Sequence, residues 1–345
     1  MNYPYVEQFR GALVEWFEHE QRDLPWRHTK EPYKIWVSEV MLQQTRVDTV
    51  IPYYNRFLEK FPTMESFAYA PEKDILKMWE GLGYYSRVRN LQAGVREVVE
   101  TYNGIVPSNR HDISKLKGVG PYTAGAVLSI AYGVPEHAVD GNVMRVLSRV
   151  LLIEEDIAVP KTKKTFEQAV MMLIDEDRTS SFNQGLMELG ALICTPTSPK
   201  CLLCPVREYC TAYQHGVQEQ LPVKTKKTKM KHLYLDVVVA KTADGKYIME
   251  KRDDTGLLAS MWQFPMFETS EPHASIASFK QKFVDVEVRS EPEFLMNLKH
   301  IFSHITWHLT VYTVDIANAN ALATEQIASL PLPVPMQKIW KALHV

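Results

Sequence analysis

The chain has 345 residues, a formal net charge of −2, 46% hydrophobic residues and 23% charged residues. This length fits two domains, each large enough to bury its own core, and the sequence has no apolar run of 18 or more residues that would indicate a membrane span. The charge excludes a wholly basic nucleic-acid binder, so any contact with DNA has to come from local groups.

The N-terminal sequence MNYPYVEQFRGALVEWFEHE carries acids and aromatics where a signal peptide would have a basic start and an apolar stretch. A cytoplasmic location is therefore the default expectation. All four cysteines fall within residues 194–210. A disulfide framework would spread its bridges to close loops, whereas a dense cytosolic cluster of cysteines indicates a metal site.

The first part of the chain is predicted to be helical, because apolar residues recur at three- and four-residue spacing. The expected helices cover residues 5–21, 35–60, 72–102, 111–132, 142–152 and 163–192. The second part is predicted to be α+β. Two β-rich runs within 234–252 flank a turn signal at Asp244-Gly245, which predicts a hairpin, and residues 302–314 alternate apolar and polar side chains.

The boundary between the two parts is expected near residues 216–232. This segment contains KTKKTKMK at 224–231, which is most simply a solvated linker and alternatively a phosphate contact. The expected division is a first domain at 1–215, a linker at 216–232 and a second domain at 233–345.

Two carboxylates in the helical part have ordinary interpretations when taken alone. Glu39 lies on a predicted helix and points away from the apolar stripe of Val37, Val40 and Met41, as a solvated glutamate would. Asp140 precedes GNVMRVLSR, in the position of an N-cap, so helix capping explains it by itself.

The segment LKGVGPYTAGAV at 116–127 has two glycines on either side of one apolar residue, between two helical stretches. Gly118 and Gly120 can take positive φ and let backbone N–H groups approach an anion closely. The N-terminus of the following helix would favour a phosphate. A plain turn between helices would use the same glycines and stays an alternative.

Cys194, Cys201, Cys204 and Cys210 place four thiolates on one loop after a helix. Four sulfur ligands suit either a [4Fe–4S] cluster or tetrahedral zinc. Zinc ribbons usually bring two Cys-x2-Cys pairs from separate hairpins, and this loop has one such pair. The spacing favours the iron–sulfur cluster and leaves zinc open.

Four segments resemble, in order and spacing, the motifs of the adenine DNA glycosylase branch of the helix-hairpin-helix glycosylase superfamily. They are VSEVMLQQTRV at 37–47, GLGYYSRVRNL at 81–91, GVGPYTAGAV at 118–127 and VDGNVMRVLSR at 139–149. The cysteine spacing is also that of the family's iron–sulfur loop. The resemblance covers residues 1–215 and implies an all-α helix-hairpin-helix glycosylase domain that holds a [4Fe–4S] cluster.

The resemblance also implies roles for single residues. Cleavage of an N-glycosidic bond builds an oxocarbenium-like sugar, so it needs an acid for the departing base and an anion for the cation. By resemblance Glu39 is the acid, which later activates water, and Asp140 stabilises the cation or bonds to it transiently. Trp26 and Arg27 would line the adenine pocket. The residues expected around 8-oxoguanine opposite the adenine are Gln44, Thr45, Leu82 and Tyr84.

These last residues have ordinary interpretations as well. Trp26 and Arg27 are typical of a packed tryptophan beside a surface arginine, and Gln44 falls inside the predicted apolar stripe. Tyr84 is either a core tyrosine or an aromatic that the glycine-rich turn presents outward. Tyr122 stands where the relatives resembling endonuclease III have a lysine that attacks the sugar. Because a phenol cannot form that Schiff base, we expect a monofunctional enzyme.

Residues 233–345 resemble the Nudix-like C-terminal domain of the same branch. They contain no REUxEExGU-type run of acids that could hold Mg²⁺, so recognition is expected in place of pyrophosphate hydrolysis. Phe302-Ser303-His304 resembles the loop that checks for the oxidised guanine. Ser303 and His304 would then bond to the altered purine edge, and a plain strand entry is the alternative.

The sequence therefore predicts a multidomain protein: an all-α helix-hairpin-helix glycosylase domain with a [4Fe–4S] loop, and an α+β Nudix-like domain. The expected activity is removal of adenine opposite 8-oxoguanine or guanine in double-stranded DNA, by a monomer. A glycosylase/lyase acting on oxidised pyrimidines is opposed by Tyr122 and the second domain. A silent mismatch binder is disfavoured by Glu39 and Asp140, and a Nudix hydrolase by the missing acidic run.

Overall fold

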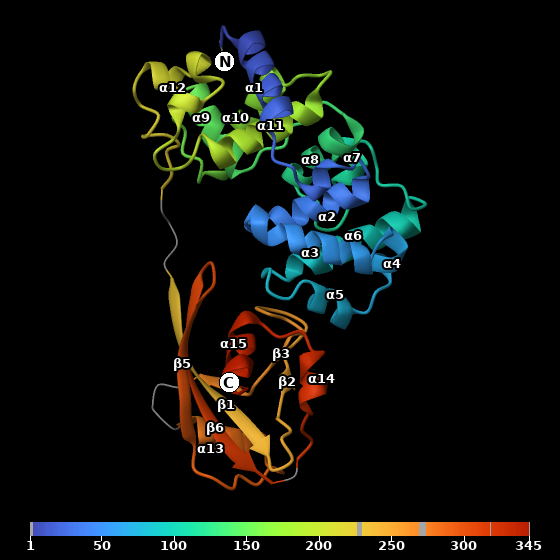
Figure 1. Cartoon of the computed structure of the whole chain (residues 1–345), viewed down its shortest axis with the longest axis vertical. Helices are drawn as coiled ribbons and strands as arrows, with labels where there is room; N and C mark the ends of the chain where they lie inside the picture. The colour runs from blue at the N-terminus through green and yellow to red at the C-terminus, as the bar shows by residue number, and fades with distance from the viewer. Residues whose placement is uncertain (1–2, 226–229, 269–273, 318, 345) are drawn as a thin grey trace. The chain divides into compact units, whose positions relative to one another are not determined.

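The computed structural model describes residues 3–225, 230–268, 274–317 and 319–344 (Figure 1). The chain separates into two compact units: Met1–Ala70 with Arg87–Lys226, and Pro71–Ser86 with Lys227–Val345. The predicted basic stretch at 224–231 falls partly outside the described residues, at 226–229. Among the helices that the structure describes, none is both long and apolar enough to cross a membrane.

The first unit is built from helices, as the apolar spacing of the sequence predicts. They are α1 (Val6–Glu20), α2 (Pro32–Leu42), α3 (Val47–Lys60), α4 (Met64–Ala68), α6 (Ser86–Thr101), α7 (Arg110–Ile113), α8 (Pro121–Tyr132), α9 (Gly141–Val150), α10 (Lys163–Leu173), α11 (Thr179–Leu192) and α12 (Thr211–Gln214). Short 3-10 turns lie at η1 (Pro25–Arg27), η2 (Pro160–Thr162), η3 (Cys201–Leu203) and η4 (Arg207–Tyr209).

The helix predicted over residues 35–60 is two helices, because the chain turns between α2 and α3. Gln44 takes a left-handed backbone conformation with φ 57°, which no helix continues. The Arg87 guanidinium donates to the carbonyls of Val40 (2.9 Å) and Met41 (3.2 Å), which α2 leaves without partners at its end. Gln44 therefore lies in a turn and not inside an apolar stripe, so that prediction is wrong.

Three other predicted helices are also interrupted. The stretch 72–102 divides into α5 (Glu72–Met78) and α6, separated by a turn in which Gly81, Gly83 and Tyr84 all have positive φ. The stretch 163–192 divides into α10 and α11, and 111–132 divides into α7 and α8 around the hairpin. In each case the apolar spacing identified helical residues correctly but not the turn between them.

The hairpin before α8 uses its two glycines differently. Gly118 has φ 79°, and a Cβ there would lie 2.7 Å from the Asn90 Cβ, so both the backbone and the packing require glycine. Gly120 has φ −87° and is the N-cap residue of α8, with Pro121 in the first turn. The expectation of positive φ is confirmed for Gly118 and wrong for Gly120.

The second unit contains a four-stranded sheet of order β4-β1-β6-β5. Its strands are β1 (Lys231–Thr242), β4 (Met266–Glu268), β5 (Glu293–Ile301) and β6 (Ile305–Ile316), with β2 (Glu250–Lys251) and β3 (Trp262–Gln263) as a separate pair. β1 runs parallel to β6, and the other neighbours are antiparallel. The unit is α+β, as predicted.

The turn predicted at Asp244-Gly245 is present, with φ 78° at Gly245 and the Thr242 N–H donating to the Lys246 carbonyl at 2.9 Å. The predicted hairpin is short: beyond the turn, its arms are joined by the bridge between Lys241 and Tyr247 and by the Ile248 N–H, which donates to the Ala240 carbonyl at 3.1 Å. The long pairings of β1 are with β6 and β4.

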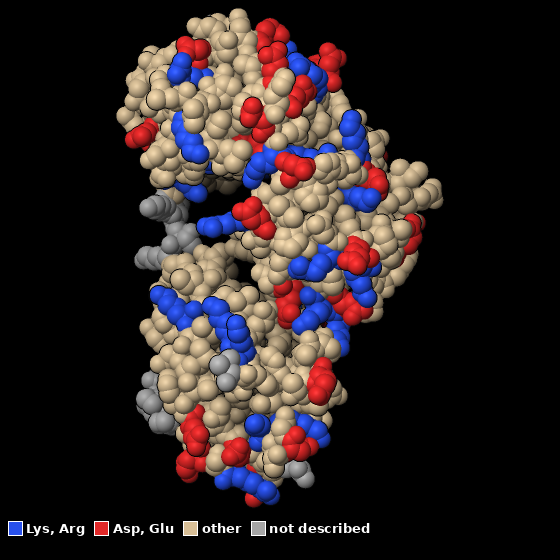
Figure 2. All heavy atoms as spheres, in the orientation of Figure 1, with Lys and Arg blue, Asp and Glu red and all other residues tan. Residues whose placement is uncertain are grey.

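Helices cover both faces of this sheet (Figure 1). One face packs against α14 (Thr324–Ala328) and α15 (Val334–Ala342), and part of the other packs against α13 (Ala274–Lys282). The segment with α5 lies against the loop before α15, where Lys77 Nζ donates to the Leu330 carbonyl (3.0 Å) and Glu80 Oε1 accepts from the Leu332 N–H (2.7 Å). Acidic and basic side chains are interspersed on the visible surface in Figure 2, in keeping with the small net charge.

Candidate active site

A cavity of about 840 Å³ opens in the first unit. Its wall is formed by η1, α2, the turn after α2 and the first residues of α8 and α9, with one side of α11. Seven residues singled out from the sequence line it: Trp26, Arg27, Glu39, Gln44, Thr45, Tyr122 and Asp140. The fold thus gathers residues from five separated segments into one place, which supports a common task.

Glu39 is buried, with 5% of its surface exposed, so the interpretation as a solvated glutamate is wrong. The reason is that α2 is covered on nearly every side: residues 35–41 are all buried, and α2 packs against both α3 and α8. Burial and, to a smaller extent, the negative charge of Asp140 raise the pKa of Glu39 to about 7. A hydrogen bond from Tyr122 opposes this shift.

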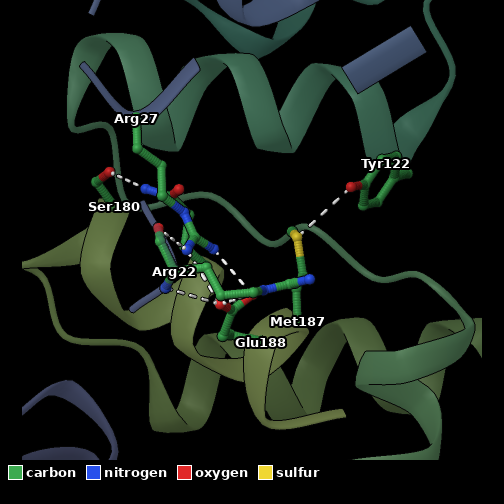
Figure 3. A network of polar contacts seen from close by, with 7 residues as sticks. Arg22, Arg27, Tyr122, Ser180, Met187 and Glu188 are labelled. Atoms are coloured by element: carbon green, nitrogen blue, oxygen red, sulfur yellow. Dashed lines mark hydrogen bonds and ion pairs between the residues drawn. The ribbon is translucent and has the colours of Figure 1, made fainter. Parts of the chain in front are cut away.

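Tyr122 is in the first turn of α8, and its hydroxyl donates to Glu39 Oε2 at 2.6 Å. The Tyr122 hydroxyl also lies 3.5 Å from the Met187 sulfur on α11, toward which it points in Figure 3. Burial raises the pKa of Tyr122 well above its ordinary value, so the phenol keeps its proton. Tyr122 therefore acts here as a hydrogen-bond donor to the carboxyl group of Glu39.

Asp140 is the N-cap of α9: its Oδ1 accepts from the Val143 N–H at 2.7 Å, and its Oδ2 accepts from Asn142 Nδ2 at 2.8 Å. The capping interpretation is thus confirmed, and Asp140 lines the cavity as well. Burial raises the pKa of Asp140, while these hydrogen bonds oppose the shift. With donors on both oxygens, Asp140 is the better site for a negative charge and Glu39 the better site for a proton.

A close backbone approach fixes the segment that carries Asp140. A Cβ at Gly125 in α8 would lie 1.7 Å from the His137 carbonyl oxygen, so only glycine lets this loop lie on α8. The loop then enters α9 beside the first turn of α8, where Tyr122 stands. This glycine explains how Asp140 and Tyr122 come to share one cavity.

A third carboxylate in the cavity, Glu188 on α11, was not predicted. It is 2% exposed and is held by Arg22 Nη2 at 2.7 Å and Arg27 Nη2 at 2.9 Å, as Figure 3 shows. Burial alone would raise its pKa, but the two guanidinium groups bring the pKa down to about 2. An acid inside the apolar run LMELGAL was the signal that sequence reasoning passed over.

The adenine-pocket candidates are both part of the packed wall. Trp26 is buried and meets Tyr54 edge to face, with 5.5 Å between ring centroids. Arg27 is only 10% exposed and its guanidinium lies 5.0 Å from the centre of the Phe17 ring. The interpretation of Arg27 as a surface arginine is wrong, because its charge is used inside the cavity.

The residues expected around 8-oxoguanine divide between the two units. Gln44 and Thr45 line the cavity of the first unit. Leu82 and Tyr84 belong to the second unit, where Leu82 is 7% exposed and Tyr84 is 45% exposed with φ 48°. Tyr84 is therefore presented outward and is not a core tyrosine.

Ser303 and His304 are also in the second unit, at the tip of the turn between β5 and β6. Both are exposed, and Ser303 Oγ lies 2.9 Å from His304 Nδ1. In the same unit α13 carries no carboxylate, and Lys282 on it pairs with Glu250, in agreement with the missing acidic run.

The four cysteines line one small pocket between α9, α11 and the loop with η3 and η4. Burial and, to a smaller extent, the neighbouring thiols raise the pKa of Cys204 to about 12 and that of Cys210 to about 11. The buried Arg149 guanidinium donates to Cys194 Sγ at 3.2 Å, so positive charge is already in place for thiolates. Four soft sulfur donors around one apolar pocket fit a [4Fe–4S] cluster.

Comparisons with protein families agree with each part of this arrangement. Residues 37–174 match the HhH-GPD superfamily of base excision DNA repair proteins, and residues 194–210 match the iron–sulfur binding domain of endonuclease III. Residues 236–342 match the Nudix domain. The helix-hairpin-helix domain, the cluster loop and the Nudix-like domain predicted from the sequence are thus confirmed, and the chain has a [4Fe–4S] cofactor.

Among solved structures, a thermostable thymine-DNA glycosylase is 31% identical with a TM-score of 0.55, covering 61% of this chain and 97% of its own. A trapped complex of endonuclease III with DNA is 25% identical with a TM-score of 0.54, covering 63% of this chain and 99% of its own.

Among curated proteins, the adenine DNA glycosylase of Mus musculus is 34% identical, over 97% of this chain and 78% of that protein. The match spans the catalytic cavity, the cluster loop and the Nudix-like domain together. An identity of this size over most of both chains, together with the gathered carboxylates and the cysteine pocket, makes this a DNA-binding base excision repair enzyme that hydrolyses N-glycosyl bonds. The chain belongs to the adenine DNA glycosylase family.

Proposed function

We propose that this enzyme removes adenine that is mispaired with 8-oxoguanine, or with guanine, in double-stranded DNA and leaves an abasic site without cutting the strand. The observation that carries the proposal is the cavity in which Glu39, with its pKa near 7, lies beside Asp140 and Tyr122. A carboxyl group that still holds its proton near neutral pH can give that proton to a departing base.

The chemistry follows from the different environments of the carboxyl groups. The adenine, extruded from the duplex, enters the cavity beside Trp26 and Arg27. Glu39 protonates the base as the N-glycosidic bond breaks, and Asp140 stabilises the positive charge that grows on the sugar. Glu39, now ionised, takes a proton from the water that attacks the sugar carbon. Tyr122 holds the Glu39 carboxyl group in place throughout.

The lining of the cavity supports base removal without strand cleavage. A lyase step needs an amine that attacks the sugar and forms a Schiff base. Among the described residues that line the cavity there are arginines but no lysine. Tyr122 has a phenol with a raised pKa, which is a donor and not a nucleophile.

Recognition of 8-oxoguanine is proposed for residues at three places. They are Gln44 and Thr45 in the turn after α2, the apolar Leu82 and the aromatic Tyr84 in the turn after α5, and Ser303 and His304 at the tip between β5 and β6. Side-chain amides and hydroxyls of this kind bond to purine edges, and an outward tyrosine can fill the gap left by an extruded base. We propose that the enzyme does so as a monomer.

The test is an excision assay on duplexes that contain adenine opposite 8-oxoguanine, adenine opposite guanine, or thymine glycol, each analysed with and without alkali. The expected result is strand breakage only after alkali, and only at the two adenine mispairs. Breakage without alkali would contradict the monofunctional proposal. Absence of any alkali-dependent break at adenine opposite 8-oxoguanine would overturn the proposed substrate.

A further inference from the structure

One end of the four-stranded sheet carries an exposed aromatic and basic surface, far along the chain from the residues of the catalytic cavity. In the register of the sheet, His308 on β6 pairs with Tyr234 on β1 and with Lys299 on β5. Paired residues of neighbouring strands point to the same face, so these three form a row across the sheet. We call the group formed by the exposed His232, Tyr234, Lys299 and Ile301 and the half-buried His308 the sheet-end surface.

The aromatic side chains of the sheet-end surface are ordered against one another. The Tyr234 and His308 rings are stacked at 4.7 Å with 15° between their planes, and His232 stacks on His308 at 5.2 Å. The two imidazoles are also joined by a hydrogen bond of 2.9 Å. Tyr234 and Ile301 are nevertheless each 61% exposed. These contacts hold the three rings in one arrangement before a partner binds, which lowers the entropic cost of binding.

The rest of this sheet face is covered by the unit's own helix. Phe279 of α13 packs into a buried cluster with Val238, Ala240 and Val314, further along the same strands. The sheet-end surface begins where this cover ends. Its aromatic groups thus lie outside the buried core of the unit and are open to an external contact.

The charge of the sheet-end surface favours an anionic partner. Residues 230–235 and 297–310 contain no aspartate or glutamate. Among their basic side chains, Lys299, His232 and His308 lie on the face of the sheet-end surface, and His304 lies at the adjoining tip. The surface is also continuous with the tip between β5 and β6, because the Lys231 N–H donates to the His304 carbonyl at 3.0 Å. In a chain of net charge −2, such an acid-free region is a local exception.

We propose that the sheet-end surface binds the sugar–phosphate backbone of duplex DNA beside the mispair. The proposal deepens the proposed function, since it extends the contact expected at Ser303 and His304. The ammonium of Lys299, the imidazole N–H groups and the Tyr234 hydroxyl donate to phosphate oxygens, and the rings pack against deoxyribose. Such contacts set affinity and register but carry no sequence information.

The test measures the affinity of the full chain, with its cluster, for a duplex containing adenine opposite 8-oxoguanine and for an undamaged duplex, over a range of salt concentrations. Lys299→Gln is expected to weaken binding and to reduce the slope of log affinity against log salt by about 1. Tyr234→Ala is expected to weaken binding roughly fivefold. Both losses are expected to be equal on the two duplexes, because the backbone is common to them.

Two matched variants control for exposure and charge. Phe294→Ala removes an aromatic of similar exposure, 59%, that lies further along β5 beside Glu293. Lys241→Gln removes a lysine at the opposite end of β1 from Lys231. Both are expected to bind DNA as the wild type does.

If both Tyr234→Ala and Lys299→Gln had the affinity and salt slope of the wild type, the proposal would be overturned. The sheet-end surface would then not be a DNA contact. Failure of the proposed function is a separate result, because it would appear as wild-type protein that binds the mispaired duplex without excising adenine. In either case the affinity measurements show whether the sheet-end surface binds DNA.

Discussion

Two glutamates in one cavity have opposite electrostatic environments. Glu39 and Glu188 are both almost fully buried, yet the pKa of Glu39 is raised to about 7 and that of Glu188 is lowered to about 2. The difference lies in their partners. Glu39 has a phenol and a neighbouring carboxylate, whereas Glu188 has two guanidinium groups. Burial makes a carboxyl group sensitive to its neighbours, and the neighbours then decide its charge.

The two environments suit different roles for Glu39 and Glu188, one in proton transfer and one in holding the cavity wall. Glu39 is the group that can exchange a proton near neutral pH, so it is the candidate acid. Glu188 is ionised at every physiological pH and fixes Arg22 and Arg27 against the cavity wall.

Glu39→Gln tests the chemical side of the comparison. The amide keeps the size of the side chain and its hydrogen bond with Tyr122 but cannot give up or accept the proton. We expect the single-turnover rate of adenine excision to fall by about 10²- to 10⁴-fold, with unchanged affinity for the mispaired duplex. Equal excision rates in the variant and the wild type would remove Glu39 from its role.

Glu188→Leu tests the architectural side. The substitution leaves the guanidinium groups of Arg22 and Arg27 in a buried wall without their counter-charge. We expect the free energy of unfolding to fall by about 3–5 kcal/mol, measured by denaturant titration. Arg22→Leu is the matched control, and because Arg27 still pairs with Glu188 we expect a smaller loss. A variant as stable as the wild type would show that the network contributes little.

Tyr122→Phe sharpens the account of how the pKa of Glu39 is set. Loss of the hydroxyl removes a hydrogen bond that lowers this pKa, so Glu39 should keep its proton to a higher pH. We expect excision to slow by roughly tenfold. We also expect the pH at which the rate begins to fall to be higher than in the wild type. A decline at lower pH would have the wrong sign and would contradict the assigned hydrogen bond.

The smallest expected effect concerns stability. When the pKa of a carboxyl group is higher in the native state than in the unfolded state, the free energy of unfolding of the protein falls as pH rises from the unfolded pKa to the native pKa. For Glu39 this window runs from the ordinary value of 4.5 to about 7. The melting temperature of the wild type should therefore fall across this window relative to Glu39→Gln. Parallel curves would indicate that the native pKa of Glu39 is not raised.

The sequence predicted the parts of the site that depend on nearby residues. Asp140 as an N-cap, the positive φ of Gly118 and the four-cysteine loop all follow from spacing within a few residues. The burial of Glu39 does not, because it comes from α3 and α8 packing on α2. The turn at Gln44 depends on Arg87, and the low pKa of Glu188 depends on arginines at positions 22 and 27. These features arise only when distant segments meet.

We propose that Glu39 acts as a protonated acid. The decisive experiment is the single-turnover rate of excision at adenine opposite 8-oxoguanine, measured as a function of pH. We predict that the rate declines as pH rises through about 7, because it follows the fraction of enzyme in which Glu39 is protonated. A rate that stays constant through this range while the enzyme remains folded would contradict the account.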